Sequence, residues 1–128
     1  MSVLIIEDEA AVAKALQKLL SLRYKNNISI ADSVKSAEAA LKSQQFSLLI
    51  VDYNLPDGTG YGLLCELTKE LSWLIDCPLM FISGVSYVDL TQEFRQSVRL
   101  FSNLHVRNKP ILAEDLYQIA DLSLELKA

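Results

Sequence analysis

The fold of this chain is decided by the stretch Leu48-Leu49-Ile50-Val51-Asp52-Tyr53-Asn54-Leu55-Pro56-Asp57-Gly58-Thr59-Gly60. Four apolar residues lead directly into Asp52, a loop rich in Pro, Asp and Gly follows, and a helical pattern comes next. This succession is typical of a buried parallel strand that passes into a helix. Ligands bind at the carboxyl ends of strands in open α/β sheets. We therefore interpret Asp52 as a chemical group rather than a surface charge.

Four further segments have the pattern of a strand. Residues 3–6 and 79–82 are continuously apolar, which predicts central strands buried on both faces. Residues 28–31 and 104–107 alternate apolar with polar residues, which predicts strands near the sheet edges. A helical pattern follows each of the five strands, in residues 9–20, 34–41, 60–73, 86–101 and 112–119.

Five strand–helix units predict a three-layer α/β fold with a parallel sheet covered on both faces. The strand order 2-1-3-4-5 places the continuously apolar strands in the centre and the alternating ones at the edges. This is the flavodoxin-like (βα)5 arrangement, whose topological switch point lies between strands one and three. The length of 128 residues predicts a single domain, residues 1–128.

Acidic residues should meet at that switch point. Glu7 and Asp8 follow the first strand and Asp52 ends the third, while Ser83 and Lys109 follow strands four and five. At an effective dielectric of ~20, two like charges ~4 Å apart cost about 4 kcal/mol, so a cation is required. The sequence offers one fixed cation there, Lys109. An all-oxygen site open to water otherwise suits Mg²⁺.

Asp52 has two alternative roles in such a crevice. It is either a metal ligand only or also a nucleophile, because a carboxylate can attack phosphorus to give an aspartyl-phosphate. In the second case Mg²⁺ and Lys109 would neutralise the transferring phosphoryl group, and the Ser83 hydroxyl would hydrogen-bond one of its oxygens.

Composition narrows the class of partner. The net charge of -4 and the pI near 4.9 argue against direct binding of nucleic acid, which needs a basic face. No apolar segment approaches the ~20 residues of a membrane span, and no leader pattern is present, so we expect a soluble cytoplasmic protein. Cys65 and Cys77 are expected to be reduced packing residues.

These residues together resemble the signature of the response-regulator receiver domain of two-component signalling. The resemblance rests on Glu7-Asp8 after strand one, Asp52 after strand three, Ser83 after strand four and Lys109-Pro110 after strand five. Each motif is weak alone, but their order and their placement at strand ends are specific. The similarity extends from Val3 to about Leu126.

The resemblance implies a phosphorylation switch rather than an enzyme with an external substrate. Asp52 would accept a phosphoryl group from a phosphohistidine on a sensor histidine kinase or phosphotransfer protein, and the domain would assist only this reaction and its own dephosphorylation. Asp8, Asp52 and the backbone carbonyl of Asn54 would hold Mg²⁺, and Glu7 would contribute through water. Ser83 would move toward the phosphate and Lys109 would pair with it.

Further implications concern the output. The Lys109-Pro110 bond is usually cis in this family. Switching would repack the face formed by the fourth helix, fifth strand and fifth helix, through which a downstream protein or a second copy would bind. The family usually has Tyr or Phe three residues before the lysine, but Val106 stands here, and the adjacent His105 should face the other way. The stretch between Ser83 and Lys109 is also longer than usual.

Two alternatives belong to other classes. A Mg²⁺-dependent, aspartate-based phosphohydrolase typically has a second aspartate two residues after the nucleophile, where this chain has Asn54. A receiver-like interaction module that needs no phosphate is supported by Val106 and the lengthened stretch after Ser83.

Overall fold

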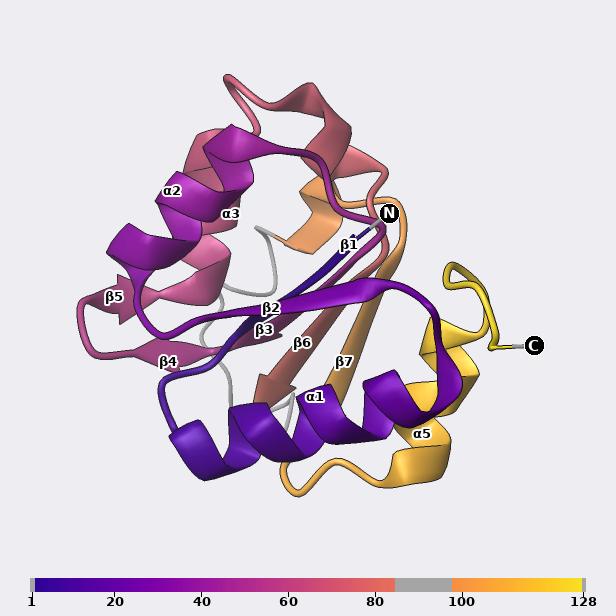
Figure 1. Cartoon of the computed structure of the whole chain (residues 1–128). Helices are drawn as coiled ribbons and strands as arrows, with labels where there is room; N and C mark the ends of the chain where they lie inside the picture. The colour runs from indigo at the N-terminus through magenta and orange to yellow at the C-terminus, as the bar shows by residue number, and fades with distance from the viewer. Residues whose placement is uncertain (1, 85–97, 128) are drawn as a thin grey trace.

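Five parallel strands form the central sheet in the computed structural model, which describes residues 2–84 and 98–127 (Figure 1). They are β1 (Ser2–Ile6), β2 (Asn27–Ala31), β3 (Leu48–Asp52), β6 (Leu79–Ser83) and β7 (Leu104–Asn108). Their order is β2-β1-β3-β6-β7, which confirms the predicted 2-1-3-4-5 order of the sheet strands along the chain. The labels β4 (Asn54–Leu55) and β5 (Gly58–Thr59) belong to a separate antiparallel hairpin that sequence reasoning did not predict.

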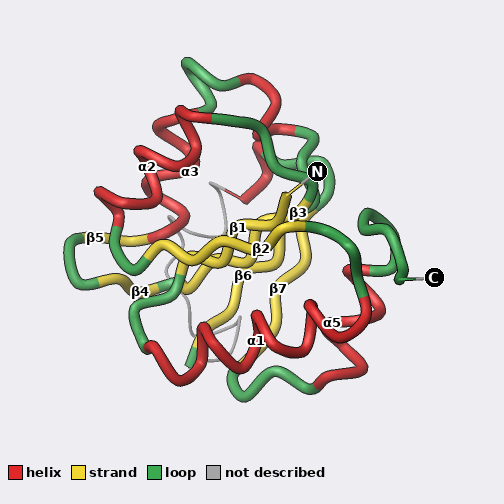
Figure 2. Tube along the Cα trace, viewed as in Figure 1, coloured by secondary structure: helices red, strands yellow, loops and turns green. Residues whose placement is uncertain are grey.

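Helices cover both faces of this sheet. They are α1 (Ala10–Arg23), α2 (Val34–Ser43), α3 (Gly60–Leu67) and α5 (Ala113–Ala120), with short 3₁₀ turns η1 (Ser72–Ile75) and η3 (Val98–Leu100). α2 and α3 lie on one face and α1 and α5 on the other (Figure 2). Most of the predicted fourth helix, residues 86–101, lies outside the described residues.

Two apolar clusters, one on each face, explain the continuously apolar strands. Successive side chains of β1 alternate between the clusters: Leu4 and Ile6 contribute to the α2–α3 side, while Val3 and Ile5 contribute to the α1–α5 side. The residues of β3 and β6 alternate in the same way and are all buried. Because both faces are dry, these strands need apolar residues throughout their central positions, and polar residues occur only at their ends.

The alternating strands lie at the edges, as predicted. β2 is mostly exposed, with Ile30 38% accessible, and β7 is partly buried along most of its length. Cys77 is buried and Cys65 partly buried, and both are free thiols. Within residues 2–84 and 98–127, every helix is too short or too polar to cross a membrane.

The third helix is shorter than predicted. The leucine spacing favoured a helix to about Trp73, but α3 ends at Leu67 and a turn leads into η1. The Thr68 hydroxyl donates to the Cys65 carbonyl at 2.7 Å, a local bond that competes with helix continuation. Leu74 is nevertheless buried, because the turn and η1 return the chain to the same core.

Candidate functional site

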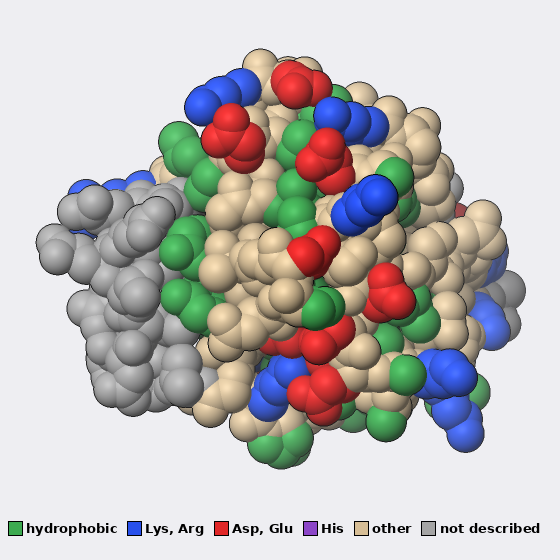
Figure 3. Space-filling view, turned by 90° about the vertical axis from the view of Figure 1, so that its left-hand side faces the viewer, with side chains coloured by type: hydrophobic (Ala, Val, Ile, Leu, Met, Phe, Trp, Pro, Cys, Tyr) green, Lys and Arg blue, Asp and Glu red, His purple; other side chains and the backbone are tan. Residues whose placement is uncertain are grey.

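The register of the sheet brings the predicted acids to one edge. Ile6 of β1 pairs with Val51 of β3, so the next residues, Glu7 and Asp52, stand side by side where these strands end. The Glu7 amide continues the sheet by donating to the Ala31 carbonyl at 2.9 Å. This edge opens onto the face shown in Figure 3, where acidic and basic side chains adjoin near the lower centre.

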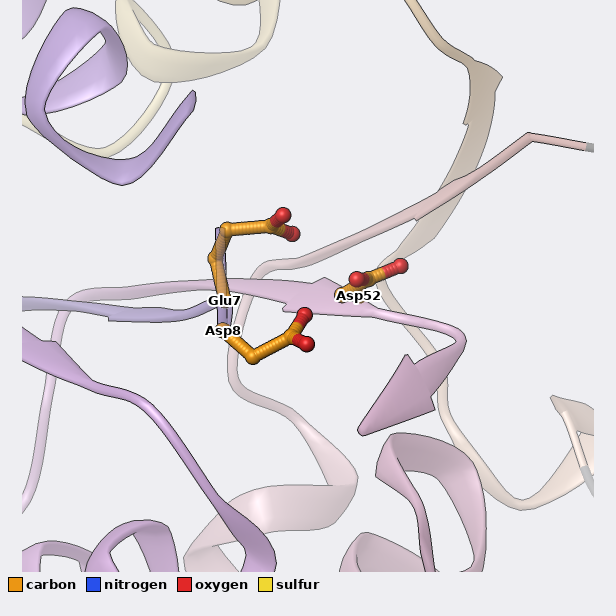
Figure 4. A group of neighbouring side chains, drawn as sticks. All are labelled: Glu7, Asp8 and Asp52. Carbon is orange, nitrogen blue, oxygen red and sulfur yellow. The ribbon is translucent and has the colours of Figure 1, made fainter. Parts of the chain in front are cut away.

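Glu7, Asp8 and Asp52 form an acidic cluster. One carboxylate oxygen of each lies within 4.8 Å of those of the other two. The side chains of Glu7 and Asp8 come from adjacent positions after β1 and both extend to the side on which Asp52 lies (Figure 4). Glu7 and Asp52 are buried, whereas Asp8 is exposed. The cluster is therefore anchored in the core and open to solvent on one side, and it can hold a metal ion.

Lys109 joins two of these acids. Its Nζ lies 3.0 Å from Glu7 Oε1 and 3.2 Å from Asp52 Oδ2. Its backbone amide donates to the Ser83 carbonyl at 2.7 Å, which extends the β6–β7 pairing by one residue. The Lys109–Pro110 peptide bond is cis, as the family resemblance implied. The backbone bond to Ser83 and the two contacts of Nζ hold the Lys109 ammonium group against the carboxylates of Glu7 and Asp52.

The electrostatics of the cluster leave it short of positive charge. Burial raises the pKa of Glu7 to about 7, and the nearby Asp52 acts in the same direction while Lys109 opposes it. Burial of Lys109 opposes its charge, but its bonds and charge interactions with Glu7 and Asp52 raise its pKa. Glu7 Oε2 is buried and has no hydrogen-bond partner among the described residues. A buried acceptor without a donor is costly, so a further cation or a water bound to it fits this position.

Ser83 belongs to the same edge of the central sheet, and Asn54 belongs to the hairpin that follows Asp52. Ser83 is buried at the end of β6, in register with Asn108. Asn54 is exposed in β4, two residues after Asp52. Gly60 lies so close to Asp52 that a Cβ there would collide with the Val51 side chain and stand 2.5 Å from the Asp52 carbonyl oxygen. The loop that begins at Asp52 therefore returns to the Asp52 backbone at Gly60.

Two acidic residues near the site were missed by sequence reasoning. Glu9 Oε1 lies 3.6 Å from Lys109 Nζ on the exposed side of the cluster. Asp57, in the turn of the β4–β5 hairpin, accepts hydrogen bonds from the first turn of α2. Asp57 precedes Gly58 in a turn-forming sequence, but nothing in that local pattern indicates a partner 23 residues earlier.

β7 places its two central residues on opposite faces. Val106 pairs with Phe81 and packs against the α2–α3 cluster, whereas His105 pairs with Met80, which belongs to the opposite cluster. This confirms the predicted alternation. Burial lowers the pKa of His105, with a smaller contribution from the charge of Arg107.

The sequence relatives of this chain are regulators. The chain matches the family described as Response regulator receiver domain over residues 3–120. It is 32% identical over 89 residues to the cell cycle transcriptional regulator CtrA of Caulobacter vibrioides, covering 70% of this chain and 37% of that protein. The chain spans about a third of the length of the first curated relatives it matches.

Solved receiver structures share the fold. The CheY-like receiver domain from Methylobacillus flagellatus aligns with a TM-score of 0.72 and 26% identity, covering 95% of this chain and 97% of that one. A signal receiver domain of an HD domain-containing protein from Pseudomonas fluorescens aligns with a TM-score of 0.78 and 18% identity, covering 95% and 92%. With the family match spanning nearly the whole described fold, this chain belongs to the response regulator receiver domain family.

Proposed function

We propose that the chain is a phosphorylation switch in which Asp52 accepts a phosphoryl group from a phosphohistidine of a sensor histidine kinase or phosphotransfer protein. The observation that carries this proposal is the position of the Asp52 carboxylate. It is buried at the end of a central strand, within reach of two further acids and in contact with Lys109. Such a site concentrates both signs of charge around one nucleophile.

The donor set supports Mg²⁺ as the cofactor. The cluster offers carboxylate oxygens, which hard divalent cations prefer, and its open side leaves room for waters and phosphate oxygens. Asp8, Asp52 and the backbone carbonyl of Asn54 would hold the ion, and Glu7, with its unpartnered Oε2, would contribute through water. When bound, Mg²⁺ supplies positive charge that neutralises the phosphoryl oxygens.

The residues of the chain would share the transfer as follows. An oxygen of Asp52 forms a bond to phosphorus while the bond from phosphorus to the donor's imidazole nitrogen breaks, and that nitrogen keeps the electron pair. Lys109, held over Asp52, pairs with the negative charge of the group that arrives. The Ser83 hydroxyl, on the neighbouring strand, would donate a hydrogen bond to a phosphoryl oxygen.

A groove beside the site supports a protein as phosphoryl donor. It has a volume of about 510 Å³, and α1 and the loop after β7 line it with mostly apolar side chains. Lys109 and Glu9 form its border on the side of the acidic cluster. Apolar side chains next to a charged centre suit contact with a protein donor better than contact with a small, highly charged phosphoester.

The output is proposed to follow the family pattern. Phosphorylation would shift the populations of the loops at this edge and repack the face that includes β7 and α5, where a downstream protein or a second copy would bind. Val106 replaces the usual aromatic residue of β7, so the signal would pass through a smaller side chain. We treat residues 1–128 as one receiver domain acting in the cytoplasm without direct contact to nucleic acid.

The proposal is tested by phosphorylating the purified chain with acetyl phosphate and Mg²⁺ and recording its intact mass. We expect wild type to gain the mass of one phosphoryl group, and Asp52→Asn to gain none because it lacks the nucleophile. Asp32→Asn is the matched control, since Asp32 also follows a strand, β2, but lies outside the acidic cluster.

The outcomes separate the alternatives. A Mg²⁺-dependent adduct in wild type and Asp32→Asn, absent from Asp52→Asn, supports the switch. Absence of any adduct, with Mg²⁺ binding measured independently, would contradict the phosphoacceptor role. Steady release of phosphate from a model phosphoester would instead favour a phosphohydrolase.

A further inference from the structure

The β4–β5 hairpin that follows Asp52 is too small to hold its own shape. It has two paired positions, Asn54 with Thr59 and Leu55 with Gly58. Isolated two-stranded hairpins are marginal in water even when they are longer. Leu55 is buried in the core, whereas Asn54 in the same short strand is exposed and lies two residues after Asp52. The geometry of the Asn54 backbone therefore depends on what anchors the hairpin.

Asp57 connects the hairpin to α2. The amide of Val34 donates to Asp57 Oδ1 at 2.7 Å, and the amide of Lys35 donates to Asp57 Oδ2 at 3.1 Å. Both donors belong to the first turn of the helix, where backbone amides have no partner within the helix. A carboxylate at this end also interacts favourably with the helix dipole. These two bonds lower the pKa of Asp57, the bond from Val34 having the largest effect.

The third free amide of α2 has a different, local partner. Ser33 is the N-cap, and its hydroxyl accepts from the amide of Ser36 at 3.1 Å. The Ser36 hydroxyl is in turn within 3.1 Å of the Ser33 amide, which completes a capping box. Ser33 and Asp57 therefore both cap α2, but only Asp57 belongs to the hairpin.

The backbone around Asp57 is closely fitted to α2. Gly58 has φ +154°, a conformation that residues with a side chain rarely adopt. A Cβ at Gly58 would stand 3.2 Å from Cγ2 of Val34, so the turn leaves no room for a side chain beside the helical residue that donates to Asp57. The contact is therefore a defined docking of the turn on the helix rather than a single exposed hydrogen bond.

We propose that Asp57 is a positioning residue for the cation site, which holds the β4–β5 hairpin on α2 and thereby fixes the Asn54 carbonyl as a ligand. This inference rests on the proposed Mg²⁺ site. Asp57 is separated from Asn54 by two residues within the hairpin, so release of Asp57 frees the strand that bears the ligand. Residues that orient metal ligands typically change affinity 10–100-fold when removed.

The test compares Mg²⁺ affinity, measured by calorimetry on the unphosphorylated chain, for wild type, Asp57→Ala, Asp57→Asn and Ser33→Ala. We expect Asp57→Ala to raise the dissociation constant about 10-fold, at the low end for an orienting residue because the contact is exposed. Asp57→Asn keeps one acceptor oxygen and should fall between Asp57→Ala and wild type. Ser33→Ala removes a cap from the same helix without touching the hairpin, and should change the constant by less than about twofold.

A second readout follows the ligand itself. The amide signals of Asn54 and Leu55 in an NMR spectrum of the metal-free chain should shift or broaden in Asp57→Ala and stay in place in Ser33→Ala. Urea unfolding should show that Asp57→Ala and Ser33→Ala both remain folded and that both lose the stability of a helix cap.

The outcomes distinguish this inference from the function on which it rests. If wild type binds Mg²⁺ and Asp57→Ala binds it equally well, or Ser33→Ala weakens binding as much, the positioning role is wrong, and the proposed function is decided by the phosphorylation experiment alone. If wild type binds no Mg²⁺, both are wrong. A loss of affinity confined to the Asp57 variants supports the positioning role.

Discussion

At the residue scale, the backbone around Asp52 depends on the missing side chain of Gly60 as well as on the charged neighbours of Asp52. Gly60 begins α3 directly against the end of β3, and its missing side chain is what lets the two backbones approach. Its amide donates to the Tyr53 carbonyl at 3.2 Å, which closes the loop that starts at Asp52. The position of Asp52 therefore depends on Gly60 through backbone packing, without a direct side-chain contact.

Gly60→Ala should destabilise the fold and disturb the site together. The added methyl meets the Val51 side chain and the Asp52 carbonyl, so we expect a loss of about 1–3 kcal/mol in the free energy of unfolding, typical of overpacking. Gly84→Ala is the matched control, because, apart from its chain neighbours, no atom of residues 2–84 and 98–127 lies within 4 Å of a Cβ at Gly84, and should stay within about 0.5 kcal/mol of wild type. Urea denaturation measures the free energy of unfolding of the two variants. Equal stability of the two variants would show that the backbone moves apart freely at Gly60.

At the element scale, the sequence predicted those strands and helices whose burial produces a regular spacing of apolar residues. Continuous apolar runs identified β1, β3 and β6, and alternation placed β2 and β7 at the edges, because burial on one or two faces sets those patterns. The β4–β5 hairpin was missed since strands of two residues have no period. The end of α3 was misplaced because Leu71 and Leu74 continue the helical spacing while a turn and η1 replace the helix.

The site residues were likewise predictable where their positions depend on the strands and not where they depend on a loop. Glu7, Asp8, Asp52 and Lys109 were predicted to converge because each ends or follows a strand, and the sheet order alone then determines their neighbours. Contacts of Asp57 with α2 depend on the path of a loop, and no sequence period encodes that path.

A second element-scale feature is the attachment of the C-terminal segment. After α5, Leu126 forms an isolated antiparallel bridge with Tyr24, the residue that ends α1. Arg23 binds both oxygens of Asp121, at 3.0 and 2.7 Å, and lies over the Tyr117 ring with 4.7 Å from Cζ to the centroid. The ends of α1 and α5 are therefore joined through one carboxylate.

Tyr24→Phe should weaken this junction. The buried Tyr24 ring stays, but its hydroxyl no longer donates to Asp121 Oδ1, a bond of 2.6 Å. We expect a loss of about 1 kcal/mol in the free energy of unfolding at pH 7, the usual worth of one hydrogen bond. Tyr117→Phe is a matched control, since it removes a bond of 2.9 Å to the Leu19 carbonyl and no bond to an acid. Urea unfolding of both variants makes the comparison.

The two variants should differ in their dependence on pH. Hydrogen bonds from Arg23 and then Tyr24 hold the pKa of Asp121 below its ordinary value. A lowered pKa in the folded state contributes stability above the ordinary carboxyl pKa, and this is lost as the pH falls through the lowered value. The deficit of Tyr24→Phe should therefore shrink below about pH 4, where carboxylates take up protons. The deficit of Tyr117→Phe should stay constant. If the loss in free energy of unfolding of Tyr24→Phe did not change with pH, the loss would come from altered packing rather than from the bond to Asp121.

At the scale of the whole molecule, the site is assembled only by the complete sheet. Lys109 and Glu7 are 102 residues apart in the chain, and Lys109 and Asp52 are 57 apart. Their strands, β7, β1 and β3, become neighbours or near neighbours only through the order β2-β1-β3-β6-β7. An unfolded chain therefore presents no cluster of oxygens, and any cation held by the acidic cluster favours the folded state.

Mg²⁺ should consequently stabilise the whole fold. A concentration one hundred times the dissociation constant should raise the free energy of unfolding by about 2.7 kcal/mol, because binding to the folded state alone shifts the equilibrium by mass action. Asp8→Asn should lose most of this gain, since it removes the exposed carboxylate of the cluster, whereas Asp32→Asn should keep it. Urea unfolding with Mg²⁺ and again after EDTA provides the measurement. If wild type and Asp8→Asn gained equally, the ion would be acting elsewhere than at the strand ends. If only wild type and Asp32→Asn gained, the acids that the sheet brings together would be the link between cation binding and the stability of the receiver fold.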